Sequence, residues 1–354
     1  HMSRMMNVGQ VAQWIAGSQL SGDGSAVVQR VHTDTRSIEP GDLFVALKGE
    51  RYDANAFLAQ AAQRGAVAAL CHADADRSGV GSMVCITVPD TRLALGELAK
   101  AWRAQFHIPV IAVTGSNGKT TVTQMLASIL AAYRPQGGSL ATRGNLNNDI
   151  GVPLTLLRMR PEHHIAVLEL GMNHPGEIST LAAMVQPTVA LVNNAQREHM
   201  EFTHTVRAVA LENGSVITAV GADGAVVFPS DDEFTPVWRT LAGSRRTATF
   251  AMDGVAQPGA LVCEQARWAE GAWHVHARGM GKDFVYRLSI AGRHNVKNSL
   301  AAAAAAFSAG VPESAVVAGL QAFEPVKGRS RVLRLAVQGR SVTLVDDTYN
   351  ANPD

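Results

Sequence analysis

At 354 residues the chain is longer than one hydrophobic core usually serves, so we expect two or three domains. Hydrophobic residues make up 47% of the sequence and charged residues 17%, a balance that is typical of globular proteins and excludes a disordered chain. A net charge of +1 and an aromatic content of 5% provide neither a basic nor a stacking surface, so we expect no nucleic-acid partner.

The first hundred residues predict a small mixed α/β domain, which we place at residues 1–107. Short apolar runs at residues 43–47 and 83–88 are separated from their surroundings by turn residues and predict strands. Residues 56–69 carry apolar side chains at nearly helical spacing, which predicts a helix between these strands.

A second domain, placed at residues 108–328, begins where the pattern changes after His107. Three continuous apolar runs each precede a helical pattern: residues 110–114, 165–170 and 188–193. This alternation predicts a mainly parallel sheet covered by helices. Residues 262–290 instead alternate between polar and apolar side chains and contain hairpin glycines, which predict an antiparallel subsheet. An alanine-rich helix is expected at residues 295–309.

Cysteine content and hydropathy indicate where the protein works. None of the three cysteines lies in a Cys-x-x-Cys pair, which is typical of a reducing compartment and argues against disulfides and a thiolate zinc site. The longest apolar stretch, residues 300–307, is far shorter than the roughly 18 residues that a membrane span needs. The N-terminus lacks the pattern of a secretory signal. We therefore expect a cytoplasmic protein without membrane insertion. Separately, we expect a monomer.

The strongest motif is the run Thr114-Gly115-Ser116-Asn117-Gly118-Lys119-Thr120-Thr121, which lies between a predicted strand and a predicted helix. Its glycines let backbone N–H groups turn toward phosphate oxygens, and the helix N-terminus adds a favourable dipole. In such a loop Lys119 would neutralise the phosphates and the Thr120 hydroxyl would bind Mg²⁺. The common pattern has a glycine at the position of Val113, so a glycine turn capped by a lysine is the structural alternative.

Two more polar side chains follow apolar runs of the second domain. Glu169 lies at the end of the run at residues 165–170, and His199 comes shortly after the run at residues 188–193. Open α/β sheets bind ligands at the carboxyl ends of their strands, and a carboxylate with an imidazole beside a phosphate loop suits Mg²⁺. The alternatives are a salt bridge or helix cap for Glu169 and a structural role for His199.

Asparagines gather in two further segments. Asn145, Asn147 and Asn148 lie in one stretch, where they either close turns through side-chain hydrogen bonds or bind a polar, peptide-like substrate. Asn295, at the start of the predicted alanine-rich helix, either caps that helix or reads the edge of a purine base. The residues alone leave both choices open.

In order and spacing, these segments resemble the ATP-dependent Mur ligases of bacterial cell-wall synthesis. The resemblance covers essentially the whole chain and rests on the phosphate loop, Glu169, His199 and residues 292–298 and 346–353. Residues 144–157 and 346–354 are similar to the family member that joins D-alanyl-D-alanine to UDP-N-acetylmuramoyl-tripeptide. The resemblance therefore implies an amide ligase that forms its C–N bond through an acyl phosphate.

The resemblance also implies ATP and Mg²⁺ as cofactors, the two substrates just named as partners, and a role for each site residue. The catalytic residues would be Lys119, Glu169 and His199, and the residues that organise Mg²⁺ would be Thr120, Glu169 and His199. Beyond the phosphate loop, the nucleotide would be contacted by Asn295, Arg329 and Asp347. The uridine diphosphate end would be held by Thr33, Asp34, Thr35, Arg36, Lys48 and Gly49. The muramoyl peptide would face Asn145, Asn147 and Asn148.

The chain departs from the family pattern at three places. Asn213, with Glu212 beside it as a candidate substitute, stands where related ligases carry a carbamylated lysine, and Asn55 stands where they carry a histidine. In the family, the strand expected at residues 341–345 begins a third domain that supplies much of the amine site. We therefore place residues 329–354 at the start of a truncated, Rossmann-like C-terminal domain and expect no complete turnover by this chain alone.

Two other functions stay open at this point. A folylpolyglutamate-type ligase has a similar loop and similar chemistry, but it lacks the uridine-binding pattern seen here at residues 31–48. A regulatory module that binds a nucleotide without catalysis would use the same loop as a switch.

Overall fold

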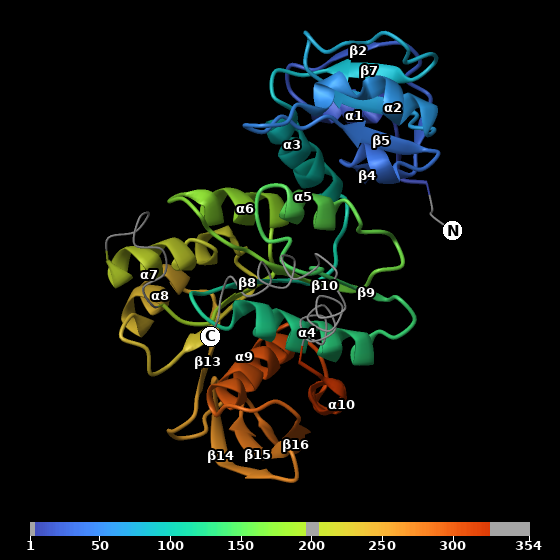
Figure 1. Ribbon diagram of the computed structural model, residues 1–354. Helices are drawn as coiled ribbons and strands as arrows, with labels where there is room; N and C mark the ends of the chain where they lie inside the picture. Colours follow the sequence, from blue (N-terminus) through green and yellow to red (C-terminus); the bar gives the residue numbers. More distant parts are fainter. Residues whose placement is uncertain (1–3, 196–204, 326–354) are drawn as a thin grey trace. The chain divides into compact units, whose positions relative to one another are not determined.

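Residues 4–195 and 205–325 are described by the computed structural model of the chain (Figure 1). Three of the predicted site residues lie outside these ranges: His199, Arg329 and Asp347. The third domain expected at residues 329–354 lies outside them as well. The fold described here is therefore that of the first two expected domains.

The described residues form two compact units. Unit 1 contains residues 4–107 together with Asp149–Pro161, and unit 2 contains Ile108–Asn148 and the described residues from Glu162 onward. One division thus falls after His107, where the sequence changes character. The segment Asp149–Pro161, which we expected in the second domain, instead packs with unit 1.

Unit 1 consists of short strands and helices. Their bounds are β1 (Met6–Asn7), α1 (Val8–Trp14), β2 (Gln19–Ser21), β3 (Val27–Val28), β4 (Arg30–His32), η1 (Thr35–Ser37), β5 (Asp42–Val45), η2 (Ala54–Ala56), α2 (Leu58–Gln63), β6 (Ala68–Cys71), β7 (Val84–Thr87), α3 (Thr91–Arg103) and α5 (Gly151–Leu156). Strands β4 to β7 run parallel, and β2 pairs antiparallel with β7, in the order β2-β7-β6-β5-β4. The prediction of a small mixed α/β domain is confirmed.

Two local features of unit 1 differ from the expected elements. Helix α2 ends at Gln63, because Gly65 forms a left-handed turn with a φ of +99° before β6 begins, so the helix is shorter than the pattern at residues 56–69 indicated. Helix α5 packs on α3, and Trp102 Nε1 donates a hydrogen bond to the Met159 carbonyl at 3.0 Å. These contacts explain why the segment around α5 belongs to unit 1.

Unit 2 is built on a nine-stranded sheet in the order β16-β15-β14-β13-β12-β11-β8-β10-β9. Its elements are β8 (Val110–Thr114), α4 (Lys119–Tyr133), β9 (Ser139–Ala141), β10 (Ile165–Glu169), α6 (Glu177–Val185), β11 (Val189–Val192), α7 (Val206–Gly214), η3 (Ile217–Ala219), β12 (Ala225–Pro229), α8 (Thr235–Ala242), β13 (Arg246–Ala251), β14 (Ala260–Ala269), β15 (Ala272–Gly279), β16 (Lys282–Leu288), α9 (His294–Ser308) and α10 (Glu313–Ala322). Strands β8 to β14 run parallel, whereas β15 and β16 are antiparallel and lie with β14 at one end of the unit (Figure 1). The predicted parallel sheet with an antiparallel subsheet is confirmed.

The inner strands of this sheet are buried on both faces, which explains their continuous apolar sequences. Every residue of β8, β10, β11 and β12 is buried. On one face, Ile111 and Val113 of β8 pack with Met125 and Ile129 of α4 and with the alanines of α9. Helix α6 covers the other face (Figure 1). Among the described residues, no helix is both long enough and apolar enough to cross a membrane.

Strand β8 lies where the chain changes direction across the sheet. The chain continues from β8 to β9 and β10 on one side, and then to β11, β12 and β13 on the other. Because these strands are parallel, the loops that follow β8, β10 and β11 leave the sheet at the same edge. In open α/β sheets such a reversal opens a crevice for ligands at the carboxyl ends of the strands.

Candidate functional site

The loop that follows β8 leads into the N-terminus of α4. Gly118 precedes the helix in a left-handed conformation, with a φ of +76°, and Lys119 is the first helical residue. The first N–H groups of a helix have no acceptor within that helix, and together with the helix dipole they favour an anion. The predicted phosphate loop thus leads directly into a helix N-terminus, the feature on which the prediction of phosphate binding depends.

Glu169 lies beside this loop at the end of β10 and is 1% exposed. Its Oε2 accepts hydrogen bonds from Thr120 Oγ1 at 3.1 Å and from Asn147 Nδ2 at 2.7 Å. Its Oε1 has no hydrogen-bond partner within the described residues. Burial raises the pKa of Glu169, although the charge of Lys119 and the two hydrogen bonds oppose the shift.

The surroundings of Glu169 are suited to a small cation. A buried carboxylate is unfavourable unless a hydrogen bond, a proton or a positive charge compensates each oxygen. The Thr120 hydroxyl supplies a second hard oxygen donor of the kind that Mg²⁺ prefers. In residues 4–195 and 205–325 no group of three or more His, Cys, Asp or Glu side chains forms a metal cluster. His199, the other predicted ligand, is outside these ranges.

Asn147 is one of the two side chains that donate a hydrogen bond to the Glu169 carboxylate. Besides donating to Glu169, it accepts a hydrogen bond from the Gly171 N–H at its carbonyl, at 2.8 Å. Within the same stretch Asn145 is exposed and Asn148 is half-buried. The contact between Asn147 and the carboxylate was missing from the sequence interpretation, because 22 positions separate the two residues along the chain.

A pocket of about 360 Å³ lies beside the phosphate loop, between the ends of β11 and β12 and the start of α9. It is lined by the amides of Asn193, Asn194 and Asn298. At its wall Lys297 Nζ and Asp231 Oδ1 form an ion pair of 2.9 Å. None of these residues was given a role from the sequence, although Lys297 and Asn298 belong to the segment 292–298 on which the family resemblance rests. Consecutive asparagines directly after an apolar strand were the available signal for two of them.

Asn295, predicted to contact the nucleotide or to cap the helix, lies inside α9. The helix begins at His294, and its N-cap residue is Arg293, which makes no side-chain cap hydrogen bond, so the capping interpretation of Asn295 is wrong. Asn295 Nδ2 donates to the Ala291 carbonyl at 2.8 Å, and Oδ1 accepts from Asn298 Nδ2 at 3.0 Å. Asn298, one turn further along, is the residue that lines the pocket.

Asn213 and Glu212 lie on α7 and differ in their surroundings. Asn213 is buried, its carbonyl accepts from Thr114 Oγ1 at 3.1 Å, and its Nδ2 has no hydrogen-bond partner in the part of the chain that is described. Glu212 Oε1 accepts a hydrogen bond from the Gly176 N–H at the N-terminus of α6, and burial raises the pKa of Glu212. The Glu212 carboxylate is thus hydrogen bonded to the N-terminus of α6.

Unit 1 contains a separate pocket of about 590 Å³. Four of the six residues predicted to hold uridine diphosphate line it, together with three others: Thr33, Asp34, Thr35, Arg36, Tyr52, Phe57 and Gln60. The rings of Tyr52 and Phe57 stack with centroids 5.6 Å apart. Lys48 and Gly49, the other two predicted residues, lie in the turn that carries Tyr52, where the Gly49 N–H donates to the Tyr52 carbonyl at 2.6 Å.

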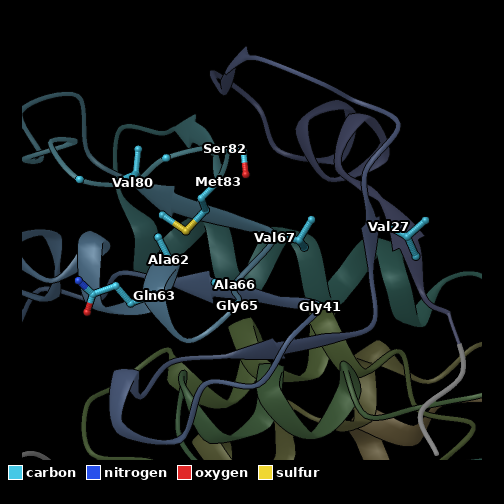
Figure 2. A pocket seen from close by; sticks show the side chains of 12 residues that line it. Val27, Gly41, Ala62, Gln63, Gly65, Ala66, Val67, Val80, Ser82 and Met83 are labelled. Atoms are coloured by element: carbon cyan, nitrogen blue, oxygen red, sulfur yellow. The ribbon is translucent and has the colours of Figure 1, made fainter.

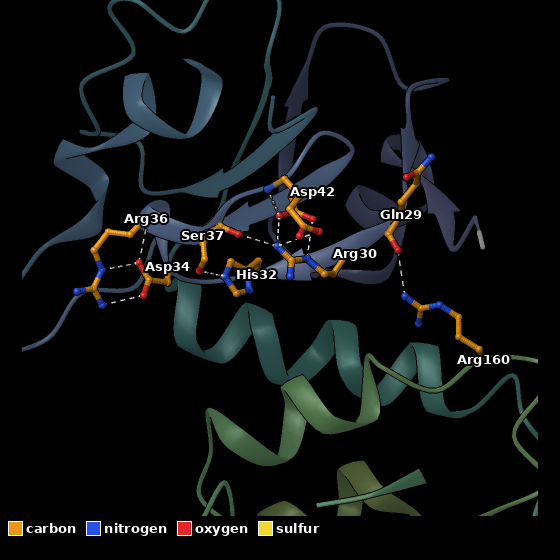
Figure 3. A network of polar contacts seen from close by, with 9 residues as sticks. Gln29, Arg30, His32, Asp34, Arg36, Ser37, Asp42 and Arg160 are labelled. Carbon is orange, nitrogen blue, oxygen red and sulfur yellow. Dashed lines mark hydrogen bonds and ion pairs between the residues drawn. The ribbon is translucent and has the colours of Figure 1, made fainter. Parts of the chain in front are cut away.

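The charged side chains of this pocket are tied to one another. Arg36 Nη2 donates to Asp34 Oδ2 at 2.8 Å, and the Arg36 N–H donates to Asp34 Oδ1 at 2.9 Å (Figure 3). These hydrogen bonds lower the pKa of Asp34 to about 2. Behind them Arg30 forms a two-bond ion pair with the buried Asp42, at 2.8 and 2.6 Å (Figure 3). The strand that precedes the loop of Asp34 and Arg36 is therefore joined to β5 by an ion pair with a buried carboxylate.

Asn55, which stands at the histidine position of the family pattern, is buried in unit 1. Its Oδ1 accepts a hydrogen bond from the His72 N–H at 2.7 Å, and its Nδ2 donates to Asp53 Oδ1 at 2.8 Å. The side chain therefore joins η2 to the end of β6.

A further pocket of about 610 Å³ lies at the opposite, amino ends of β5, β6 and β7 (Figure 2). It is lined mainly by small and apolar residues, among them Gly41, Val67 and Met83. Two of its backbone donors are already paired: the Gly41 N–H with the Gly65 carbonyl at 3.1 Å, and the Val67 N–H with the Asp42 carbonyl at 2.9 Å. We assign no chemistry to this pocket.

Two family models match the chain. The model described as Mur ligase middle domain matches residues 113–306, and the model described as Mur ligase family, catalytic domain, matches residues 27–103. The chain is 39% identical to UDP-N-acetylmuramoyl-tripeptide–D-alanyl-D-alanine ligase of Escherichia coli (strain K12), over 96% of this chain and 72% of the relative. The enzyme of the same name from Haemophilus influenzae is 36% identical, over 98% of this chain and 73% of the relative.

Solved structures show the same similarity. A crystal structure of MurF from Acinetobacter baumannii superposes with a TM-score of 0.82 at 35% identity and covers 93% of this chain and 70% of that chain. MurF ligase from Thermotoga maritima in complex with ADP superposes with a TM-score of 0.72 at 27% identity, covering 85% of this chain and 67% of that chain.

Proposed function

The chain belongs to the Mur ligase family, and we propose that it joins D-alanyl-D-alanine to UDP-N-acetylmuramoyl-tripeptide while ATP is converted to ADP and phosphate. The two relatives named UDP-N-acetylmuramoyl-tripeptide–D-alanyl-D-alanine ligase support the choice of substrates. The Thermotoga maritima relative in complex with ADP supports the choice of nucleotide. The proposal includes action in the cytoplasm as a monomer.

The observation that carries the proposal is that the positive charge of Lys119 and the negative charge of Glu169 both lie at the N-terminus of α4. Lys119 begins this helix and acts electrostatically on the buried carboxylate of Glu169, to which Thr120 is hydrogen bonded. A helix N-terminus and a lysine suit the phosphates of a nucleotide. Phosphoryl transfer depends mainly on positioning and charge neutralisation, and this arrangement supplies both.

The residues present fit Mg²⁺. Thr120 and Glu169 would hold the ion, because both offer oxygen donors and Glu169 Oε1 has no other partner within the described residues. His199, outside those residues, is the third proposed ligand. When bound, the ion would neutralise negative charge on the phosphates. Asn213 cannot carry a carbamate, and Glu212 is bonded to α6, so we propose no second ion held by α7.

The proposed reaction has two steps. The γ-phosphoryl group of ATP passes to the terminal carboxylate of the tripeptide, which gives an acyl phosphate and ADP. The amine of D-alanyl-D-alanine then attacks the acyl carbon, and the amide forms as phosphate leaves and the amine loses its proton. In this scheme Lys119 and the N–H groups at the start of α4, those of Thr120 and Thr121 among them, hold the phosphates, and the preceding loop residues, Gly115 to Gly118, set the position of that helix N-terminus.

The pocket of unit 1 is proposed to hold the uridine diphosphate end of the substrate. Tyr52 and Phe57 provide aromatic faces for a base, and Arg36 provides a guanidinium for a phosphate. Thr33, Asp34 and Thr35 complete this site, and Lys48 and Gly49 position Tyr52. The peptide end is proposed to face Asn145 and Asn148, whereas Asn147 acts on Glu169.

The remaining contacts are proposed to be made with the nucleoside. The pocket that Asn298 lines lies next to the phosphate loop and is lined by amide groups suited to the edge of a purine base. Asn295 positions Asn298 through the hydrogen bond between their side chains. Arg329 and Asp347, outside the described residues, are proposed as contacts to the nucleotide and its ribose.

Calorimetric titration tests the proposal on this chain. We expect saturable binding of ADP with Mg²⁺ and, independently, of UDP-N-acetylmuramoyl-tripeptide. Lys119→Ala should weaken ADP binding by more than about tenfold, because it removes a charge-assisted contact to phosphate, and should leave the second titration unchanged. Lys282→Ala is the matched control. Lys282 lies in the antiparallel subsheet, over the Phe307 ring of α9, and not in the phosphate loop.

Each outcome of these titrations has a separate meaning. Unchanged ADP binding in Lys119→Ala would refute the role of the phosphate loop and favour a module that uses it differently. Binding of a folate in place of the UDP-linked peptide would favour a folylpolyglutamate-type ligase. Failure of the unsubstituted chain to bind either proposed ligand would refute the function itself.

A further inference from the structure

Asn194 contacts the phosphate loop with both polar atoms of its side-chain amide. Its Oδ1 accepts hydrogen bonds from the Ser116 N–H at 3.0 Å and from the Asn117 N–H at 2.9 Å. Its Nδ2 donates to the Asn117 carbonyl at 2.8 Å. One side chain therefore binds three backbone groups of two consecutive loop residues.

Asn193 adds a second connection to the same loop. Its N–H donates to the Thr114 carbonyl at 2.9 Å, so it continues the pairing of β11 with β8. Its Nδ2 donates to the Asn117 carbonyl at 2.9 Å and to Asn298 Oδ1 at 3.1 Å. Asn193 and Asn298 are buried, so water competes little for these hydrogen bonds. Asn193 is thus attached to the centre of the sheet through β8, and Asn194 follows it directly in the chain.

We propose that Asn194, supported by Asn193, is a positioning residue that fixes the phosphate loop before the nucleotide binds. This inference rests on the proposed function of the loop as a nucleotide site. The N–H groups bonded to Asn194 belong to the first half of the loop. The N–H groups expected to meet phosphate lie at the start of α4, those of Thr120 and Thr121 among them.

Loop entropy explains why such a residue is useful. A loop that contains glycine loses much conformational freedom when a ligand fixes it, and that loss weakens binding. Hydrogen bonds that fix the loop in the free protein remove part of this cost before binding, which is preorganisation. The 78 positions between Ser116 and Asn194 mean that the fold, and not the local sequence, supplies these bonds.

Two measurements on Asn194→Ala test the proposal. Hydrogen–deuterium exchange of the loop peptide in the ligand-free chain should become at least about tenfold faster, because both N–H groups lose their acceptor. The Kd for ADP should rise about tenfold, which corresponds to roughly 1.4 kcal/mol. Asn7→Ala is the matched control, because it removes an asparagine that caps α1 in unit 1. It should leave both quantities unchanged.

The outcomes separate the inference from the proposed function. If the unsubstituted chain does not bind ADP, the proposed function fails. If it binds ADP and Asn194→Ala binds equally well, the positioning role is wrong. Weaker ADP binding without faster exchange would also overturn it, because Asn194 would then act by direct contact with the nucleotide.

A second variant covers the case in which Asn194→Ala does not fold. Asn194→Asp retains an acceptor oxygen for both N–H groups, so the exchange protection of the loop should persist in the ligand-free chain. Loss of that protection in a folded Asn194→Asp chain would contradict the proposed contacts.

Discussion

The two candidate pockets are built in different ways. In unit 2 the site consists of backbone groups and buried side chains at the ends of β8, β10 and β11, and Glu169 and Asn193 are 1% and 3% exposed. In unit 1 the pocket consists of side chains on loops, where Tyr52 is 51% exposed and the Arg36 side chain is 87% exposed. A substitution in unit 2 should therefore act through the backbone, whereas one in unit 1 should remove a single contact.

The largest effect is expected at Gly118, where a new side chain would strain the loop and collide with its supports. A Cβ there would lie 2.8 Å from Asn298 Oδ1 and 3.1 Å from Asn193 Nδ2, at a φ of +76°. We expect Gly118→Ala to lower the free energy of unfolding by about 2 to 3 kcal/mol. ADP affinity should fall by more than about 30-fold, because the amides behind the loop are displaced.

Gly137→Ala is the matched control for this prediction. Gly137 has a φ of +80°, but a Cβ there would have no heavy atom within 4 Å among the described residues. It should therefore show only the backbone strain, about 1 kcal/mol, with unchanged ADP binding. Urea unfolding and ADP titration measure both quantities. If Gly118→Ala and Gly137→Ala lost equal amounts of stability and of ADP affinity, the collision with Asn193 and Asn298 would contribute nothing to either quantity.

The second prediction concerns a single contact in unit 1. Arg36→Ala should weaken binding of UDP-N-acetylmuramoyl-tripeptide by about tenfold, because one charge-assisted contact to a phosphate is lost. Thermal stability should fall only slightly, because the exposed contact of Arg36 with Asp34 is weak, and ADP binding should not change. Arg92→Ala is the control, since Arg92 forms a comparable ion pair with Asp149, at 2.6 Å, away from the pocket. A loss of ADP binding in Arg36→Ala would break the separation between the two pockets.

How much of each pocket could be predicted follows from the range of its contacts. The strand, loop and helix around Lys119 could be predicted because an apolar run, a glycine turn and a helical pattern are adjacent in the sequence, and Glu169 was singled out because it ends an apolar run. The hydrogen bonds of Asn194 to the loop were not found, because they join residues 77 and 78 positions apart. Asn194 reaches the loop because the strand before it, β11, lies next to the strand before the loop, β8, in the sheet.

The same reasoning explains the other differences between expectation and structure. Tyr52 and Phe57 were missed because their stacking depends on a turn whose shape the sequence pattern did not indicate. The segment Asp149–Pro161 was placed in the wrong unit because a chain can leave a domain and return to it without a change in composition. The overall α/β class was predictable because burial on both faces requires continuous apolar strands.

The third prediction uses the buried carboxylate of unit 2 in the absence of metal. Burial raises the folded-state pKa of Glu169 above its ordinary value of 4.5. The folded state therefore binds more protons than the unfolded state, and stability should fall as pH rises from 4.5 through the folded pKa. Glu169→Gln should remove this slope and be at least as stable as the parent near pH 7 in EDTA. Urea midpoints measured across pH provide the check, and an unchanged slope in the variant would contradict it.

The smallest effect, with the opposite sign, is expected at Asp34 in unit 1. Hydrogen bonds from the Arg36 side chain and N–H lower the pKa of Asp34 from 3.8 to about 2, so the unfolded state binds more protons than the folded state in that range. The stability contributed by the carboxylate is present above pH 3.8 and should be lost as pH falls toward 2. Exposure and salt screening keep the effect small.

Asp34→Asn keeps an oxygen for the Arg36 N–H, so its urea midpoint should lie slightly below that of the parent at about pH 5 and converge with it at about pH 2. High salt should abolish the difference, because the contact is electrostatic and close to water. A difference that is independent of pH and salt would mean that this loop, like the one in unit 2, is held by its shape and not by its charges.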